Sequence, residues 1–201
     1  MESVSTTKRR PAARRGEGEK LRDEILDVTA RLLEESGDPR TLSLRAIARE
    51  VGVAATSIYL HFDSLDAATV AVKDQKYGEL REALSAADRS APDDPRSRLR
   101  AATRAYVDFA LERPGTYKVL FSTNLNLPPV GDGGFLGARA FGVAVEVLRG
   151  TGITDEEAHM AATQLWCLMH GMVTLRADHP NFHWPSLDDQ IDDLVDRLLP
   201  G

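Results

Sequence analysis

Only one of the 201 residues is a cysteine, and no apolar run in the chain is long enough to cross a membrane. A single thiol, that of Cys167, excludes an internal disulfide and is typical of a reducing compartment. A membrane helix needs about 20 consecutive apolar residues, and the residues that follow Met1 also lack the apolar core of a signal peptide. We therefore expect a cytoplasmic protein that does not contact a membrane.

The chain also lacks the alternation of apolar and polar residues that is typical of β-strands, and it contains no internal repeat. Apolar residues recur instead every three or four positions, which predicts an all-α fold. The length allows one large domain or two small ones. A loop is expected at 124–134, where prolines and glycines gather. The expected helices span about 19–35, two short segments within 43–62, then about 64–87, 96–111, 116–122, 135–148, 154–177 and 186–199.

Local signals predict where several of these helices begin and end. Gly37 is expected to adopt the left-handed conformation that closes the first helix, and Pro39 blocks its continuation. Ser43 can cap the next helix through its hydroxyl. Thr154 and Glu157 have the spacing of a capping box, in which each side chain binds a free amide of the first turn.

The net charge of −6 is unevenly distributed along the chain. The first 15 residues hold five cationic side chains against the single acid Glu2, whereas acidic residues crowd the last helix. Residues 1–17 show no apolar period, so we interpret them as a disordered basic arm. A basic arm on an acidic body is compatible with DNA contact at one end of the protein.

Residues 43–62 have the pattern of two short helices around a tight turn. Leu44, Ile47 and Val51 lie at helical spacing and predict one buried stripe. Gly52 supplies the permissive backbone that a sharp turn needs, and Ile58 is expected to face the core from the second helix. Such a helix-turn-helix places its second helix in the major groove of DNA.

This order of elements, followed by Ile58-Tyr-Leu-His-Phe-Asp-Ser64, resembles the DNA-binding domain of TetR-family transcriptional regulators. A second segment, Trp166-Cys-Leu-Met-His-Gly171, resembles the subgroup whose C-terminal domain is named for its Trp-His-Gly (WHG) residues. The resemblance implies a three-helix DNA-binding domain over 18–65. It also implies a helical, ligand-binding and dimer-forming domain over 66–201.

The resemblance implies DNA contacts from six positions within residues 43–62. Arg45 corresponds to a position that contacts bases or phosphates, and Tyr59 corresponds to one that touches the DNA backbone. Ala55 can meet a thymine methyl group but cannot hydrogen-bond a base edge. We therefore expect base discrimination to rest on Arg45, Thr56, Ser57 and the shape of the groove. The expected DNA-binding residues are Arg45, Ala55, Thr56, Ser57, Tyr59 and His61.

Aromatic residues recur along the second domain and allow two interpretations. Ligand pockets are lined mostly by apolar and aromatic groups, but an ordinary core has the same composition. His170 follows Trp166 by about one helical turn, so both side chains share a face. His170 can equally be a core histidine that is hydrogen-bonded to a neighbour. The candidates for ligand contact are Tyr106, Phe109, Tyr117, Phe121, Trp166, Met169 and His170.

A homodimer is expected, because a two-fold operator favours a two-fold protein. The last helix has an apolar stripe opposite an acidic face, and the helix over 154–177 begins with small residues that allow close packing. The stripe could instead cover the body of its own chain, so amphipathicity alone does not decide. The candidate interface residues are Ala158, Ala161, Leu187, Ile191, Leu194, Val195 and Leu198.

The implied function is a repressor that a small apolar or aromatic molecule releases from a palindromic double-stranded operator. A DNA-binding activator or architectural protein without a ligand is the alternative, since the sign of regulation follows from the resemblance alone. A third possibility is an enzyme whose active site lies in the helical second domain. Cys167 and His170 lack an orienting acid, however, and Pro180 prevents His179 and His183 from aligning on a helix as metal ligands. We expect no catalysis, no cofactor and no metal.

Overall fold

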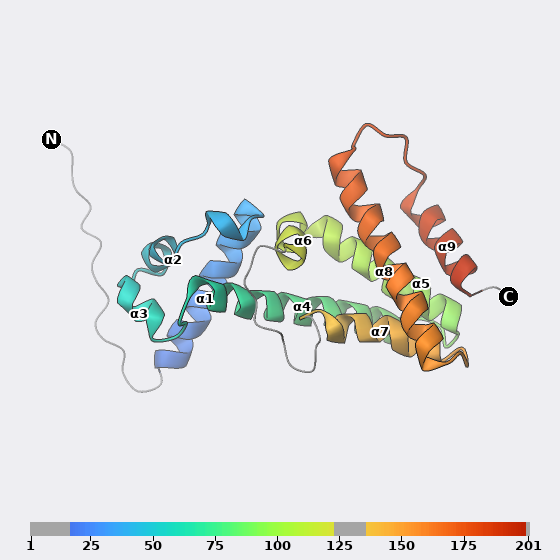
Figure 1. The fold of residues 1–201 in the computed structure, drawn as a ribbon, viewed down its shortest axis with the longest axis horizontal. Helices are drawn as coiled ribbons and strands as arrows, with labels where there is room; N and C mark the ends of the chain where they lie inside the picture. Colours follow the sequence, from blue (N-terminus) through green and yellow to red (C-terminus); the bar gives the residue numbers. More distant parts are fainter. Residues whose placement is uncertain (1–16, 123–135, 200–201) are drawn as a thin grey trace. The chain divides into compact units, whose positions relative to one another are not determined.

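The computed structural model describes residues 17–122 and 136–199, and every regular element in these two ranges is a helix (Figure 1). The predicted all-α fold is confirmed. The expected loop at 124–134 and residues 1–16 of the expected arm lie outside the described residues. The elements are α1 (Glu17–Ser36), the 3-10 turn η1 (Pro39–Thr41), α2 (Leu44–Val51), α3 (Ala55–Tyr59), α4 (Leu65–Ser90), α5 (Pro95–Glu112), α6 (Pro114–Phe121), α7 (Ala138–Arg149), α8 (Asp155–Asp178) and α9 (Leu187–Leu198).

The local signals in the sequence act as expected at the helix ends. Gly37 has a φ of 64°, and its amide donates a 2.8 Å hydrogen bond to the carbonyl of Leu33. Thr154 and Glu157 form the capping box at the start of α8. The backbone amide of Thr154 donates to the Glu157 carboxylate over 2.8 Å, and this hydrogen bond lowers the pKa of Glu157. These helix boundaries follow from interactions within four residues of each end.

One helix begins earlier than the sequence suggested. The helices expected at 96–111 and 116–122 left residues 112–115 between them, but α6 already begins at Pro114, two residues after α5 ends. Proline has no amide hydrogen to donate, and the first residues of a helix have no acceptor for one. Pro114 therefore fits the first position of α6, and as a proline it also prevents α5 from continuing.

The described chain forms two compact units. Unit 1 contains α1, η1, α2, α3, α6 and the part of α4 up to Gln75. Unit 2 contains the rest of α4 together with α5, α7, α8 and α9. This division does not follow a single boundary after residue 65, because α6 packs against α1 although about 80 residues separate them in the sequence.

The core of unit 1 collects apolar side chains from all of its α-helices. Helix α6 joins it through Val119 and by a close backbone approach, since a Cβ on Gly115 would lie 1.9 Å from the carbonyl oxygen of Glu34 in α1. Lys73 of α4 is buried and donates a 2.9 Å hydrogen bond to the carbonyl of Ser122, just past the end of α6. Burial lowers the pKa of Lys73. The buried members are Ile25, Leu33, Leu42, Ile47, Ala48, Ile58, Phe62, Ala68, Val72 and Val119.

Unit 2 is organised around α5, which packs against α7, α8 and α9. Three arginines of α5 pair with three aspartates of α9, and the partners recur every fourth residue in both helices. Exposed ion pairs contribute up to about 1 kcal/mol each, so their main effect is to set the antiparallel register of the two helices. The pairs are Arg96 with Asp196, Arg100 with Asp192, and Arg104 with Asp188.

The apolar stripe of α9 faces α5 within the same chain. Ile191, Leu194 and Val195 are buried there, and Leu187 and Leu198 are half-buried. Ala158 of α8 is also buried in unit 2. The structure therefore favours the alternative in which the stripe covers the protein's own body. These four buried side chains cannot also form an interface between two copies.

None of the helices in the described ranges is both long enough and apolar enough to cross a membrane.

Candidate nucleic-acid interface

Helix α2 is capped at both ends, and its C-terminal cap forms the turn to α3. The Ser43 hydroxyl accepts a 3.1 Å hydrogen bond from the amide of Ala46 and so caps α2. Gly52 ends α2 with a φ of 80°, a conformation that residues with a side chain rarely adopt. The amides of Gly52 and Val53 both donate to the carbonyl of Ala48, over 3.0 and 2.9 Å. The chain is thus reversed within a few residues, as a helix-turn-helix requires.

One side of α3 is anchored in unit 1. Ile58 is completely buried, and Phe62, three residues past the end of the helix, is also buried. The guanidinium of Arg22 in α1 lies 5.2 Å from the centre of the Phe62 ring, a cation–π contact that adds to this anchor. Because its inner side is held in this way, the opposite side of α3 is left free to enter a groove.

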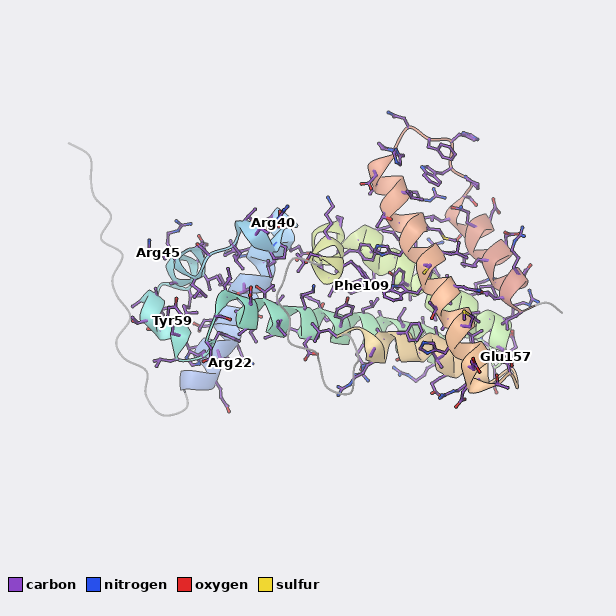
Figure 2. The ribbon with its side chains drawn as sticks, viewed as in Figure 1. Arg22, Arg40, Arg45, Tyr59, Phe109 and Glu157 are labelled. Atoms are coloured by element: carbon purple, nitrogen blue, oxygen red, sulfur yellow. The ribbon has the colours of Figure 1, made fainter. Side chains whose placement is uncertain are left out.

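The residues predicted to contact DNA differ in how far they are exposed. Arg45 and Thr56 are exposed, and Tyr59 is 55% exposed. Figure 2 shows Arg45 and Tyr59 on the neighbouring helices α2 and α3 at the same end of unit 1. Ser57 is half-buried. The most accessible of the predicted contacts are therefore an arginine, a threonine and a tyrosine.

Two predicted residues are less accessible. Ala55 packs against the core of unit 1 and presents only part of its side chain. His61 is half-buried beside Gly18 of α1.

Leu60 is an exposed residue of this surface to which the sequence analysis assigned no role. Its side chain is 82% exposed, the largest value among the exposed large apolar residues of the described chain. The signal was present in the sequence, because Leu60 follows Thr56 by four residues and helical spacing places both on one face.

Two family models match this chain. Residues 25–67 match the model described as bacterial regulatory proteins, tetR family. Residues 99–200 match the model described as tetracyclin repressor-like, C-terminal domain, which covers half of the chain. This protein belongs to the TetR family. Regulators of the TetR family bind DNA and dimerise, so α2 and α3 form the DNA-binding helix-turn-helix of this regulator.

Relatives of this TetR-family protein cover most of its length. The uncharacterized HTH-type transcriptional regulator Rv0681 from Mycobacterium tuberculosis is 28% identical over an alignment of 189 residues, which covers 90% of this chain and 80% of the relative. A protein of unknown function from Rhodococcus sp. RHA1 has a similar structure, with a TM-score of 0.74, 25% identity, and coverage of 89% of this chain and 93% of the other. A TetR variant from Acinetobacter baumannii AYE, solved in complex with minocycline, has a TM-score of 0.59, 18% identity, and coverage of 85% and 92%.

The seven residues predicted to contact a ligand are divided between the two units. Tyr106 and Phe109 of α5 and Met169 of α8 are buried in unit 2, where Trp166 and His170 are half-buried. Tyr117 and Phe121 belong to α6 of unit 1, and their ring centres lie 4.8 Å apart.

Burial shifts the pKa of two groups in unit 2 so that their neutral forms are favoured. Burial lowers the pKa of His170, so its ring is neutral at pH 7. Burial also raises the pKa of Tyr77, a residue of α4 that the sequence analysis passed over, and the nearby Tyr106 adds to the rise. The Trp166 ring meets Phe141 of α7 edge-on, with ring centres 6.2 Å apart. Unit 2 therefore combines aromatic surfaces with a few neutral polar groups.

An open pocket of about 420 Å³ lies elsewhere in unit 2, between the start of α5, the loop that precedes α8 and the end of α9. It contains none of the predicted ligand residues. Its lining residues are Asp94, Pro95, Arg96, Thr151, Ile153, Leu198 and Leu199.

Three of the four residues considered for metal binding or nucleophilic chemistry lie on the surface, and the fourth, His170, is half-buried. His179 and His183 are exposed, and so is Cys167. Within the described residues, no three side chains of His, Cys, Asp or Glu are grouped so that they could hold a metal ion.

Proposed function

We propose that this protein is a ligand-responsive repressor that binds a palindromic operator and is released from it by a small apolar or aromatic molecule. The exposed outer side of α3, away from the buried Ile58, is the observation that supports DNA binding. There Thr56 and Tyr59 project from a helix whose inner side is fixed in the core of unit 1. Recovering genomic fragments bound by the full-length protein tests this proposal, because a repressor of this kind should enrich a few sites with inverted half-sites about one helical turn apart.

A palindromic operator needs a second copy of the chain, and we propose that the outer face of α8 is the dimer interface. Met160, Leu168 and Leu175 are all exposed on α8, and Gln164 and Gly171 lie between them at steps of three or four residues. This spacing places all five on one outer face of α8, which is apolar except for Gln164.

The proposed interface differs in part from the one expected from the sequence. Ala161 precedes Leu168 by seven residues, so it remains on the proposed face. Ala158, Ile191, Leu194 and Val195 are left out, because they are already buried within one chain.

A ligand would act by preferring one of two arrangements of the dimer. It can release the operator only if it binds more tightly to the arrangement in which the two α3 helices no longer match the half-sites. The buried aromatic and neutral polar groups of unit 2 support an apolar or aromatic effector. The minocycline complex of the Acinetobacter baumannii protein supports an effector of this class in a protein of the same fold.

Replacing Tyr59 with alanine should weaken operator binding by about 1–3 kcal/mol, the range for one base or phosphate contact. The side chain is 55% exposed, so its loss should not unfold unit 1. Fluorescence anisotropy with an operator duplex measures the affinity, and circular dichroism checks the fold. Tyr59→Phe is the matched control, since it removes only the hydroxyl. Wild-type affinity in a folded Tyr59→Ala variant would rule out the assignment of Tyr59.

An apolar or aromatic effector should quench the fluorescence of Trp166, which lies among the predicted ligand residues on α8. The measurement needs a Trp184→Phe background, because Trp184 is the other tryptophan. The signal of Trp166 should fall at the same effector concentration that raises the melting temperature and releases the operator. A stabilising effector that leaves the Trp166 signal unchanged would place the binding site elsewhere.

A further inference from the structure

The exposed face of α3 offers few groups that can recognise a base. Residues 53–64 contain no arginine, lysine, asparagine or glutamine. Guanine is usually read by a bidentate arginine or lysine and adenine by asparagine or glutamine. The hydroxyls of Thr56 and Ser57 can bond to more than one base, so they discriminate weakly. Tyr59 adds a hydroxyl that the resemblance assigns to the DNA backbone, and the most exposed side chain here, that of Leu60, is apolar.

The methyl group of Thr56 and the side chain of Leu60 are exposed apolar groups that lie on the same face of α3. Leu60 has φ −72° and ψ −16°, so the helical path of α3 continues through it. Thr56 and Leu60 are then one turn apart on the same face. Ile58, on the other side, is completely buried. The threonine methyl group and the leucine side chain thus form a small apolar patch on the side of α3 that faces away from the core.

Leu60 has no evident role in holding the protein together. At 82% exposure it contributes little to the core, and it is absent from the apolar residues that pack against the core of unit 1. Single exposed leucines are common on protein surfaces. This one caps the C-terminal end of the recognition helix of a DNA-binding motif, where its surface can be buried by the major groove.

We propose that Thr56 and Leu60 read the 5-methyl groups of thymine, so that the base pairs beneath α3 in each half-site are mainly A·T. The thymine methyl group is the one apolar group that a base pair presents in the major groove, and it is recognised by apolar contact. Arg45 comes from α2 and can read a guanine or bind a phosphate beside this patch. This inference rests on the proposed operator binding.

A preference for A·T could also arise from groove shape, and uracil separates the two causes. Uracil forms the same base pair as thymine and presents the same hydrogen-bonding groups, but it lacks the methyl group. Readout by groove width or flexibility responds to the sequence of base pairs. Readout by Leu60 responds to the methyl group itself.

The test begins with selection of bound sequences from a random DNA pool by the full-length protein. Each thymine of the selected half-site is then replaced by uracil, one at a time, and the affinity is measured by anisotropy. Loss of one contacted methyl group should weaken binding by about fourfold, the factor that corresponds to burial of one methylene-sized group. Leu60→Ala should abolish this effect at the position that Leu60 contacts, because the two changes remove the same contact.

Leu111→Ala is the matched control, since Leu111 is also a half-exposed leucine but lies on α5 in unit 2. It should keep both the affinity and the full effect of uracil. Selected half-sites that are mainly G·C beneath α3, uracil substitutions without effect, or an effect that persists in Leu60→Ala would each overturn the proposal. If no sequence is enriched and binding to any DNA is insensitive to salt, the proposed operator binding fails instead, because phosphate contacts always make binding salt-dependent.

Discussion

Leu168→Asp is expected to produce a folded monomer that has lost most of its affinity for the operator. Leu168 is 50% exposed within one chain, so the aspartate is solvated in the monomer. In the proposed dimer it would place an unpaired charge between two apolar faces of α8. An uncompensated buried charge costs about 3–5 kcal/mol, so the dimer dissociation constant should rise by about a hundredfold or more. Sedimentation, circular dichroism and operator titration measure the three parts of this result.

Two other leucines provide the comparison. Leu111→Asp changes an exposed leucine outside the proposed interface, so that variant should remain a dimer. Leu194→Asp changes a side chain that is only 5% exposed in the core of unit 2. That variant should lose its fold rather than yield a folded monomer. A Leu168→Asp protein that sediments as a dimer and binds the operator normally would place the interface on another surface.

Gly115→Ala is expected to destabilise unit 1 and to weaken DNA binding with it. A Cβ at this position would lie 1.9 Å from the carbonyl oxygen and 2.8 Å from the carbonyl carbon of Glu34. These are backbone atoms of α1 and cannot rotate away, so α6 must move outward and leave Val119 poorly packed. Forcing extra volume into a packed site costs about 1–3 kcal/mol, which corresponds to roughly 2–12 °C in Tm for a chain of this size.

Gly78→Ala is the matched control for that experiment. Gly78 lies within α4, and a Cβ there would meet nothing within 4 Å. Alanine should therefore stabilise the helix by about 0.5–1 kcal/mol. Thermal unfolding should move in opposite directions for the two variants. A Gly115→Ala protein with a Tm equal to or above that of the wild type would show that α6 is not held closely against α1.

Much of this fold could be predicted because the signals are local. Gly37 ends α1, Ser43 caps α2, Gly52 reverses the chain, and Thr154 opens α8 with Glu157. Each signal depends on hydrogen bonds or backbone conformation within about four residues, so it does not require knowledge of the rest of the chain. The helix-turn-helix was recognisable for the same reason, since all of its determinants lie within residues 43–62.

The partners of the apolar faces could not be predicted in this way. The stripe of α9 was evident from its spacing, but only the packed structure shows that Ile191, Leu194 and Val195 face α5 of the same chain. The spacing likewise did not reveal that α6 packs on α1. The hydrophobic effect is the reason: it is non-directional and depends on the apolar area removed from water, so a stripe predicts that a face is buried without naming what covers it. Long-range packing makes that choice, and it leaves the outer face of α8 and the side chain of Leu60 exposed.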